Sequence, residues 1–262
     1  MSKRAALVGF ILSVALLLAA VSADAAKNRP VEKEEVTIDA PDTSVELVGY
    51  LYLPELKKYP KPPLVVLLHE AGSSHAAWEG FAQELASRGM AALAMDLRGY
   101  GLSIYNLRTH KNRSQGAFYD GDFAAYPNDI AILVGRAIRD WGFRLDTTKF
   151  AMIGAELGGS AGILWAEHEP RVKYAAIISP GLERKTLRIA PTIQAYGNRP
   201  LYLAVSDKDI YGLESCYLLS DVVDRVLDLD IFEGLLHGNT LVNANSEVQG
   251  KLINDLQRYF EL

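Results

Sequence analysis

The sequence is poor in cysteine and has no excess of positive charge, and each shortage excludes a class of protein. Its 262 residues include one cysteine, Cys216, so the chain cannot form an internal disulfide. Its 27 lysines and arginines are outnumbered by 32 aspartates and glutamates, which gives a net charge of -5. This balance gives no reason to expect a nucleic acid as a partner.

The first residues have the features of an export signal. Lys3 and Arg4 precede an uncharged apolar run over residues 5–21, and small residues suited to signal peptidase follow at 21–25. The alternative is an uncleaved membrane anchor, but the run is near the lower length limit for a spanning helix. Cys216 lies far from the cleavage site, so lipidation there is excluded.

The signal divides the chain into three expected segments. We expect cleavage to leave a protein without stable membrane insertion, in the periplasm or outside the cell. The expected segments are a signal peptide (1–25), a polar tether (26–33) and one folded domain (34–262).

The expected domain alternates short apolar runs with amphipathic stretches. Continuous apolar runs predict strands that are buried on both faces. The alternation of strands with helices predicts an α/β fold, with a mostly parallel central sheet and helices on both faces. The predicted strands are 34–39, 45–53, 64–68, 91–95, 150–154, 175–178, 201–205 and 229–232. The predicted helices are 76–88, 128–141, 157–168, 215–225 and 246–260.

Polar side chains occur where these strands end. In parallel sheets, ligands bind at the carboxyl ends of the strands, so these residues are candidates for a shared site. They are His69, Asp96, Glu156, Ser179, Asp209 and His237.

The most informative stretch is 150–168, which reads as a buried strand, a sharp turn of small residues and a helix. The turn, Gly154-Ala155-Glu156-Leu157-Gly158, has the spacing of the G-x-S-x-G nucleophile elbow. Glu156 stands at the position of the serine. The frame of the motif is therefore present, while its nucleophile differs.

Five motifs occur in the order of a known superfamily. They are LVVLLHEAGSS (64–74), MDLRGYGLS (95–103), IGAELGG (153–159), LYLAVSDKDIYG (201–212) and LLHG (235–238). Together they make the chain resemble the α/β-hydrolase superfamily over nearly all of the expected domain. The His69-Glu70 pair is more similar to dienelactone hydrolases, which place a glutamate beside the nucleophile.

The resemblance implies roles for several residues. Asp209 resembles the acid of the catalytic triad and His237 its general base. The backbone N–H groups of Ala71 and Leu157 resemble an oxyanion hole, which requires no particular side chain. The expected pocket residues are His69, Glu70 and Ser179.

The implied activity is hydrolysis of a small ester, lactone or alkyl substrate by an esterase-like enzyme. No cofactor is implied. Glu70, Glu156, Asp209 and His237 lack the local spacing of metal ligands, so no metal site is expected. The sequence leaves the oligomeric state open.

The role of Glu156 stays open at this point. It could be a lost nucleophile in a binding protein, a pseudoenzyme. It could attack a saturated carbon, as aspartate does in haloalkane dehalogenases and epoxide hydrolases of this fold. It could be a general base for water, with Glu70 nearby, because two close carboxylates raise the pKa of one of them. A carboxylate attacking an ester would yield a reactive anhydride, which makes that route poor.

A second register of the elbow is also possible. Gly158-Gly159-Ser160-Ala161-Gly162 is a literal G-x-S-x-G, with Ser160 as the alternative nucleophile. It would extend the strand through two glycines and bury Glu156 within it.

Some residues near the site are expected to be structural. Asp96, Arg98 and Gly99 should hold the loop after the strand at 91–95. Ser73 and Ser74 should cap the helix that begins near His75.

Overall fold

The computed structural model describes residues 31–42, 44–222 and 228–262. The expected signal peptide and most of the expected tether lie outside these residues. The fold below is that of the compact unit Glu32–Leu262. Among the described residues, none of the helices has the length and apolar character needed to span a membrane.

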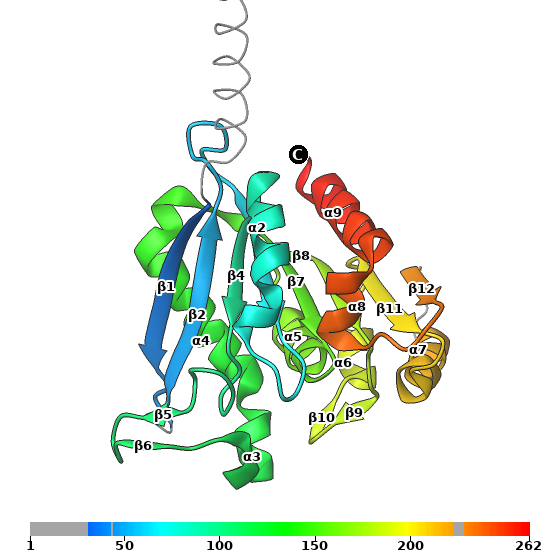
Figure 1. Ribbon diagram of the computed structural model, residues 1–262, viewed down its shortest axis with the longest axis horizontal. Coiled ribbons are helices and arrows are strands. Elements are labelled where there is room, and N and C mark those ends of the chain that lie inside the picture. The colour runs from blue at the N-terminus through cyan, green and yellow to red at the C-terminus, as the bar shows by residue number, and fades with distance from the viewer. Residues whose placement is uncertain (1–30, 43, 223–227) are drawn as a thin grey trace, which may run out of the picture. The chain divides into compact units, whose positions relative to one another are not determined.

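The described residues form a sheet of eight strands, in the order β1-β2-β4-β3-β7-β8-β11-β12 (Figure 1). β2 is antiparallel to both β1 and β4, and all neighbours from β4 to β12 are parallel. The strands are β1 (Glu32–Asp39), β2 (Glu46–Leu53), β3 (Pro63–Leu68), β4 (Ala91–Met95), β7 (Asp146–Ala155), β8 (Val172–Ile178), β11 (Leu201–Ser206) and β12 (Asp228–Phe232). Two short hairpins pair β5 (Tyr105–Asn106) with β6 (Lys111–Asn112), and β9 (Glu183–Arg184) with β10 (Leu187–Arg188).

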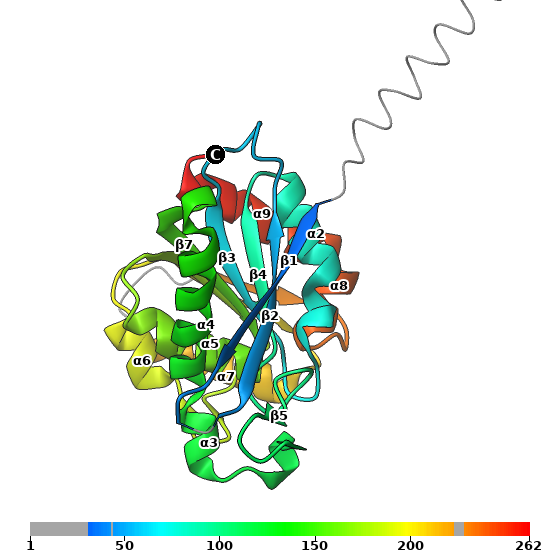
Figure 2. The ribbon, with the colours of Figure 1, turned by 90° about the vertical axis from the view of Figure 1, so that its left-hand side faces the viewer.

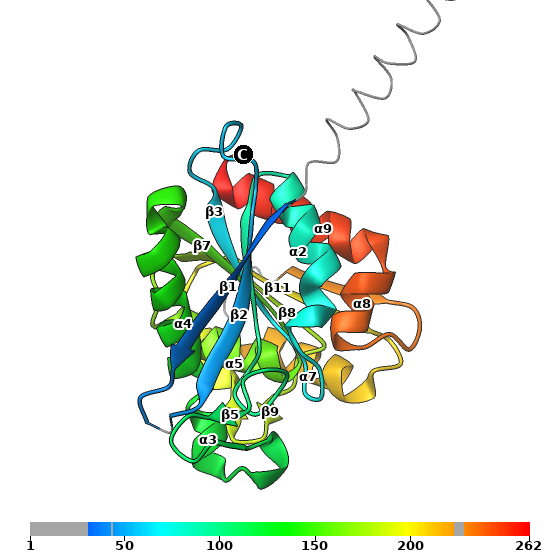
Figure 3. The same ribbon diagram turned by 60° about the vertical axis from the view of Figure 1, so that its left-hand side comes forward.

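Helices cover both faces of the sheet, as Figures 2 and 3 show. α4, α5 and α6 pack in sequence on one face, and α2, α8 and α9 lie on the other. The α-helices are α2 (Glu79–Ser87), α3 (Asp120–Ala124), α4 (Tyr126–Trp141), α5 (Leu157–Glu167), α6 (Ala190–Ala195), α7 (Ile210–Val222), α8 (Gly238–Ala244) and α9 (Ser246–Phe260). Single 3-10 turns are η1 (His75–Trp78), η2 (Gln115–Ala117) and η3 (Gly142–Arg144).

This architecture confirms the predicted α/β fold with a mostly parallel sheet. Every residue of β3, β4 and β11 is buried, because helices cover both faces of these central strands. β1 lies at the edge, and its run of charged residues suits a strand with one open side. The carboxyl ends of the parallel strands therefore meet at one edge of the sheet, where the polar residues were expected to gather.

The structure corrects several element boundaries. α7 begins at Ile210, five residues before the predicted start at Ser215. α8 was not predicted, because its seven residues, GNTLVNA, are too few to show a helical period. β1 begins at Glu32, within the stretch assigned to the tether. Residues 102–126, for which no strand or helix was predicted, contain β5, β6, η2 and α3.

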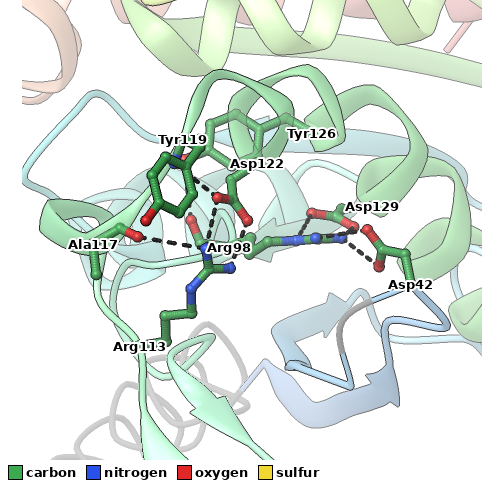
Figure 4. A network of polar contacts seen from close by, with 8 residues as sticks. All are labelled: Asp42, Arg98, Arg113, Ala117, Tyr119, Asp122, Tyr126 and Asp129. Atoms are coloured by element: carbon green, nitrogen blue, oxygen red, sulfur yellow. Dashed lines mark hydrogen bonds and ion pairs between the residues drawn. The ribbon is translucent and has the colours of Figure 1, made fainter.

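Arg98 holds the loop after β4 through a buried ionic network (Figure 4). Its Nε donates to Asp129 Oδ2 at 2.8 Å, and its Nη1 donates to Asp42 Oδ2 at 2.8 Å. Arg98 and Asp129 are almost wholly buried, with side-chain exposures of 1% and 0%. Burial lowers the pKa of Arg98, but its hydrogen bonds to Asp129 and Asp42 outweigh this and raise it, so the guanidinium stays charged. The structural role expected for Arg98 is confirmed.

Asp96 joins the loop after β3 to the loop after β4. Its Oδ1 accepts the backbone N–H of His75 at 2.6 Å, and its Oδ2 accepts the N–H of Leu102 at 2.7 Å. Asp96 therefore caps the turn at His75. The predicted serine cap is wrong, because the side chain of Ser74 makes no capping bond. The structural role expected for Asp96 is confirmed.

Candidate active site

The elbow adopts the first of the two registers considered. β7 ends at Ala155, α5 begins at Leu157, and Glu156 lies between them at φ 48° and ψ -109°. Few residues other than glycine adopt such a backbone, and its strain is typical of functional turns. Gly154 and Gly158 permit this turn, because a Cβ on either would lie within 2.6 Å of a backbone atom.

Ser160 lies one turn into α5, away from solvent. Its side chain is fully buried, and its Oγ donates to the carbonyl oxygen of Glu156 at 3.3 Å. This bond is a local helical contact that places the hydroxyl against the backbone. The geometry therefore does not support Ser160 as the nucleophile.

Replacing Ser160 by alanine is expected to leave any hydrolytic activity within about twofold of the wild type, because Ser160→Ala removes only a buried helical contact. Steady-state kcat/KM on the substrates considered below would measure this. A loss of several orders of magnitude with an unchanged melting temperature would instead make Ser160 the nucleophile.

Asp209 and His237 come together from two loops at the carboxyl edge of the sheet. Asp209 precedes α7 and His237 precedes α8, and Asp209 Oδ2 lies 2.7 Å from His237 Nδ1. The His237 side chain is 40% exposed, whereas that of Asp209 is 11% exposed. A carboxylate in this position orients the ring and favours the proton on Nδ1, which leaves Nε2 as the basic atom.

The loop that carries His237 is held by two hydroxyl groups. Ser206 Oγ donates to the carbonyl oxygen of Leu236 at 2.5 Å, and Ser179 Oγ accepts the N–H of Gly238 at 3.0 Å. Ser179 was expected to line the pocket. Its side chain is fully buried, so we assign it to positioning the His237 loop.

The two backbone groups expected to form an oxyanion hole converge on one atom. The N–H groups of Ala71 and Leu157 both donate to Oε2 of Glu156, each at 2.9 Å. The converging geometry is that of an oxyanion hole. The Glu156 side chain itself therefore occupies the place where the oxygen of a bound substrate would lie.

Sequence reasoning missed Arg184, the cation beside Glu156. Its Nε lies 3.2 Å from Glu156 Oε1, and its guanidinium lies 4.4 Å from the ring centroid of Tyr211. The hydroxyl of Tyr211 donates to the carbonyl oxygen of Glu183, which ties α7 to β9. Arg184 lies in a stretch without clear periodicity, so no local signal identified it.

His69 is locked into the fold. Its Nδ1 lies 2.7 Å from the carbonyl oxygen of Glu70, and its Nε2 accepts the N–H of Leu97 at 3.0 Å. The ring is fully buried, and this burial lowers the pKa of His69, so it stays neutral. Both ring nitrogens are engaged. We therefore assign His69 a structural role in place of the expected pocket role.

Glu70 lies between the elbow and the His237 loop. Its backbone N–H donates to Asn239 Oδ1 at 3.0 Å, and its Oε2 occupies the space in which a Cβ on Gly238 would lie, 1.7 Å away. Burial raises the pKa of Glu70, and the nearby charge of Glu156 adds to this rise, while His237 and Asn239 oppose it. The carboxyl group of Glu70 therefore lies beside both the elbow and the His237 loop.

Replacing Glu70 by glutamine is expected to stabilise the protein at pH 7 but not at pH 4. Because the folded-state pKa is raised above the unfolded value of about 4.3, ionisation costs stability as pH rises from about 4 through the folded-state pKa. Glu70→Gln removes that cost. Thermal unfolding of both proteins at pH 4, 5.5 and 7 would measure it, and a stability difference independent of pH would contradict it.

Tyr100 packs against His69 and is influenced by the charge of Glu156. Its ring meets that of His69 edge-on with centroids 5.4 Å apart, and only 6% of the residue is exposed. Burial raises the pKa of Tyr100 to about 12, and the negative charge of Glu156 contributes. Its hydroxyl is therefore protonated at neutral pH.

No group of three or more His, Cys, Asp or Glu residues in the described part of the chain could hold a metal ion.

Solved structures of several hydrolases share this fold. An esterase of Pyrococcus furiosus is 14% identical, with a TM-score of 0.68 over 87% of this chain and 91% of its own. A dienelactone hydrolase of Anabaena variabilis is 16% identical, with a TM-score of 0.64 over 89% and 98%. A thermostable carboxyl esterase of Bacillus coagulans is 11% identical, with a TM-score of 0.69 over 88% and 99%. At these identities the likeness establishes the fold alone.

A match to a sequence family identifies relatives more narrowly than a shared fold does. No curated protein sequence matches the chain significantly. Residues 60–215 match the family of serine aminopeptidases S33, a stretch that includes the elbow and Asp209. Because the match covers more than half of the chain, this α/β-hydrolase-fold protein belongs to the serine aminopeptidase S33 family.

Proposed function

We propose that this protein is a hydrolase in which Glu156 attacks a saturated carbon and His237 activates the water that releases the product. One observation carries the proposal. Oε2 of Glu156 accepts both donors of the oxyanion hole at 2.9 Å, while Oε1 points to Arg184. Oε2 is therefore held by the two N–H groups, which leaves Oε1, the partner of Arg184, as the oxygen available to attack.

This geometry favours alkyl transfer over the ester or lactone hydrolysis first expected from the sequence. In ester hydrolysis the carbonyl oxygen of the substrate must accept the two N–H groups as charge develops on it. Here Oε2 already accepts both. Attack on a saturated carbon needs no free oxyanion hole, and its product is an ester of Glu156 rather than an anhydride.

The first step forms that ester. Oε1 attacks the carbon of a substrate R–X, and the carbon–X bond breaks with its electron pair leaving on X. The carboxylate becomes a neutral ester whose carbonyl oxygen is Oε2. This oxygen stays on the N–H groups of Ala71 and Leu157, so the hole is already placed for the second step.

The second step hydrolyses the ester. Nε2 of His237 takes a proton from water, and the resulting hydroxide adds to Cδ of Glu156, while Asp209 stabilises the charged ring. The negative charge that develops on Oε2 is stabilised by the two N–H groups. Collapse breaks the bond from Cδ to Oε1, and His237 returns its proton to the departing alcohol. Glu156 then loses a proton to solvent and is ionised again.

An oxygen-labelling experiment tests the covalent step. A single turnover of short bromoalkanes and chloroalkanes in ¹⁸O-labelled water should place the label in the Glu156 peptide, because water adds to Cδ. The first molecule of alcohol should carry unlabelled Oε1. Label in the alcohol alone would show that Glu156 acts as a general base, and the covalent proposal would be wrong.

The His237→Ala variant provides a second test of the covalent step. Without the base, the Glu156 ester should accumulate, and the intact protein should gain the mass of the alkyl group. Glu156→Gln should lower kcat/KM by at least roughly 10³-fold, because it removes the attacking oxygen. Both variants should keep the wild-type melting temperature to within a few degrees, which separates loss of chemistry from loss of fold.

Ligand binding without catalysis is the second candidate function. The ion pair between Arg184 and Oε1 favours it, because a neutralised carboxylate is a weaker nucleophile. In that case the protein should turn over no haloalkane, epoxide or ester. His237→Ala should then gain no mass with any of them.

We also propose that the mature protein is exported. The positive start, the apolar run at residues 5–21 and the small residues at 21–25 support this. Mass spectrometry of the exported protein should give an N-terminus just after Ala23 or Ala25. Retention of residues 1–25 on a membrane-bound protein would favour an anchor instead.

A further inference from the structure

Arg184 is a partly buried cation whose hydrogen-bonding capacity is almost unused. Its side chain is 23% exposed, and it lies on β9, packed over the ring of Tyr211. A guanidinium has five N–H donors. Its Nε is buried and makes no hydrogen bond of good geometry, although Glu156 Oε1 lies 3.2 Å away. Among the described residues, neither terminal nitrogen of Arg184 has a hydrogen-bonding acceptor.

The charge of Arg184 is balanced at rest by Glu156 alone among its contacts in the described chain. No other carboxylate of those residues forms an ion pair with it. The neighbouring cation on the same hairpin, Arg188, pairs instead with Glu183 at 2.9 Å and is largely exposed. The two arginines of β9 and β10 therefore differ, because only Arg184 depends on the ionised state of the elbow residue.

Alkylation of Glu156 would remove this partner. When Oε1 forms the ester, residue 156 becomes neutral, and one negative charge appears on the leaving group in the same step. Arg184 then faces a neutral ester and has free donors. A charged group that is partly desolvated needs a counter-ion, and a departing anion meets that need.

We propose that Arg184 forms an anion subsite that receives the leaving group. This inference rests on the proposed covalent function. It requires the terminal nitrogens of Arg184, rather than Nε, to contact the anion. The packing on Tyr211 holds the guanidinium beside the elbow while its partner changes from Glu156 to the released anion.

The subsite defines the substrate class. A guanidinium donates hydrogen bonds but does not give up a proton at neutral pH. It therefore suits a leaving group that is stable as an anion, such as a halide or a sulfonate. An opened epoxide leaves an alkoxide, which must gain a proton. The substrate class is thus an alkyl halide or alkyl sulfonate.

Halide binding to Glu156→Gln tests the subsite without turnover. The glutamine is neutral, as the ester would be, and Arg184 is left without its counter-ion. Chloride and bromide binding would be followed by the line width of the halide nuclear resonance. Glu156→Gln should bind bromide about tenfold more tightly than the wild type, as expected for hydrogen bonds to a charged group. Glu156→Gln with Arg184→Met should lose this gain, and Glu156→Gln with Arg188→Met should keep it.

Turnover of haloalkanes provides a second test of the Arg184 subsite. Arg184→Met should lower kcat for bromoalkanes and chloroalkanes by roughly tenfold or more, and Arg184→Lys should restore part of it. Arg188→Met should leave kcat unchanged. If Arg184→Met unfolds, the comparison of Arg184→Lys with the wild type still decides the matter, because lysine keeps the charge but has fewer donors.

The outcomes separate this inference from the proposed function. Arg184-dependent halide binding without wild-type turnover would support the anion subsite and overturn the covalent hydrolase. Wild-type turnover with no gain of halide binding in Glu156→Gln would support the hydrolase and overturn the subsite. Preferential turnover of epoxides over haloalkanes would also overturn the subsite.

Discussion

Replacing Glu156 by serine is expected to raise ester hydrolysis well above that of the wild type. The shorter side chain frees the N–H groups of Ala71 and Leu157 to bind the carbonyl oxygen of an ester, and His237 is already paired with Asp209 at 2.7 Å. An oxyanion hole contributes about 10²–10³-fold to such a reaction. We therefore expect hydrolysis of short p-nitrophenyl esters by Glu156→Ser to exceed that of the wild type by at least roughly 10²-fold.

Two further variants show whether this gain uses the expected groups. Glu156→Ala frees the same donors but supplies no hydroxyl, so it should not gain the activity. His237→Ala in the serine background should remove it, because the hydroxyl loses its base. The backbone strain at residue 156 (φ 48°) is already present in the fold, so serine inherits the turn without a new cost. Equal ester hydrolysis by Glu156→Ala and Glu156→Ser would refute this account.

Removing Arg98 is expected to cause the largest loss of stability. Arg98→Met leaves Asp129 as a fully buried carboxylate without its ionic partner. Breaking a buried ion pair from one side costs about 3–5 kcal/mol. For a domain of this size that corresponds to a fall in melting temperature of roughly 10 °C. Thermal and urea unfolding would measure it.

The pH dependence of this loss gives an internal check. Burial raises the pKa of Asp129 to about 6 in the wild type, and its hydrogen bonds to Arg98 oppose that rise. Arg98→Met removes this opposition, so the pKa of Asp129 should rise further. The cost of the substitution should therefore grow as pH rises above about 6. Asp42→Asn is the matched control, because the Asp42 side chain is 47% exposed and its loss should cost about 1 kcal/mol or less. An equal loss in both variants would contradict the role of burial.

Much of the fold could be predicted from the local sequence pattern. The continuous apolar runs that became β3, β4 and β11 were identified because burial on both faces leaves no place for polar side chains. Boundaries were less well predicted. The start of α7 at Ile210 was missed, because Ile210, Tyr211 and Leu218 are apolar yet exposed and obscure the helical period.

The site was only partly accessible to the same reasoning. The elbow register, the two hole donors and the pair of Asp209 with His237 lie where the motifs placed them, because strand ends and tight turns are local features. The surroundings of His69 are not local. Its position after a strand suggested a pocket, but its bond to the N–H of Leu97, 28 residues away, turns it into the interior.

Sequence pattern alone was sufficient to predict the parallel sheet and the edge at which polar residues meet. It also showed that Glu156 stands at the position of the elbow serine. Tertiary contacts decided which groups surround that glutamate. Ala71 lies 85 residues from Glu156, and Arg184 lies on a separate hairpin, yet both contact its carboxylate. The direction of a side chain depends on whichever charges and donors the fold brings to it. A motif records the position of residue 156, whereas the folded chain determines that Oε2 meets two N–H groups and Oε1 meets Arg184.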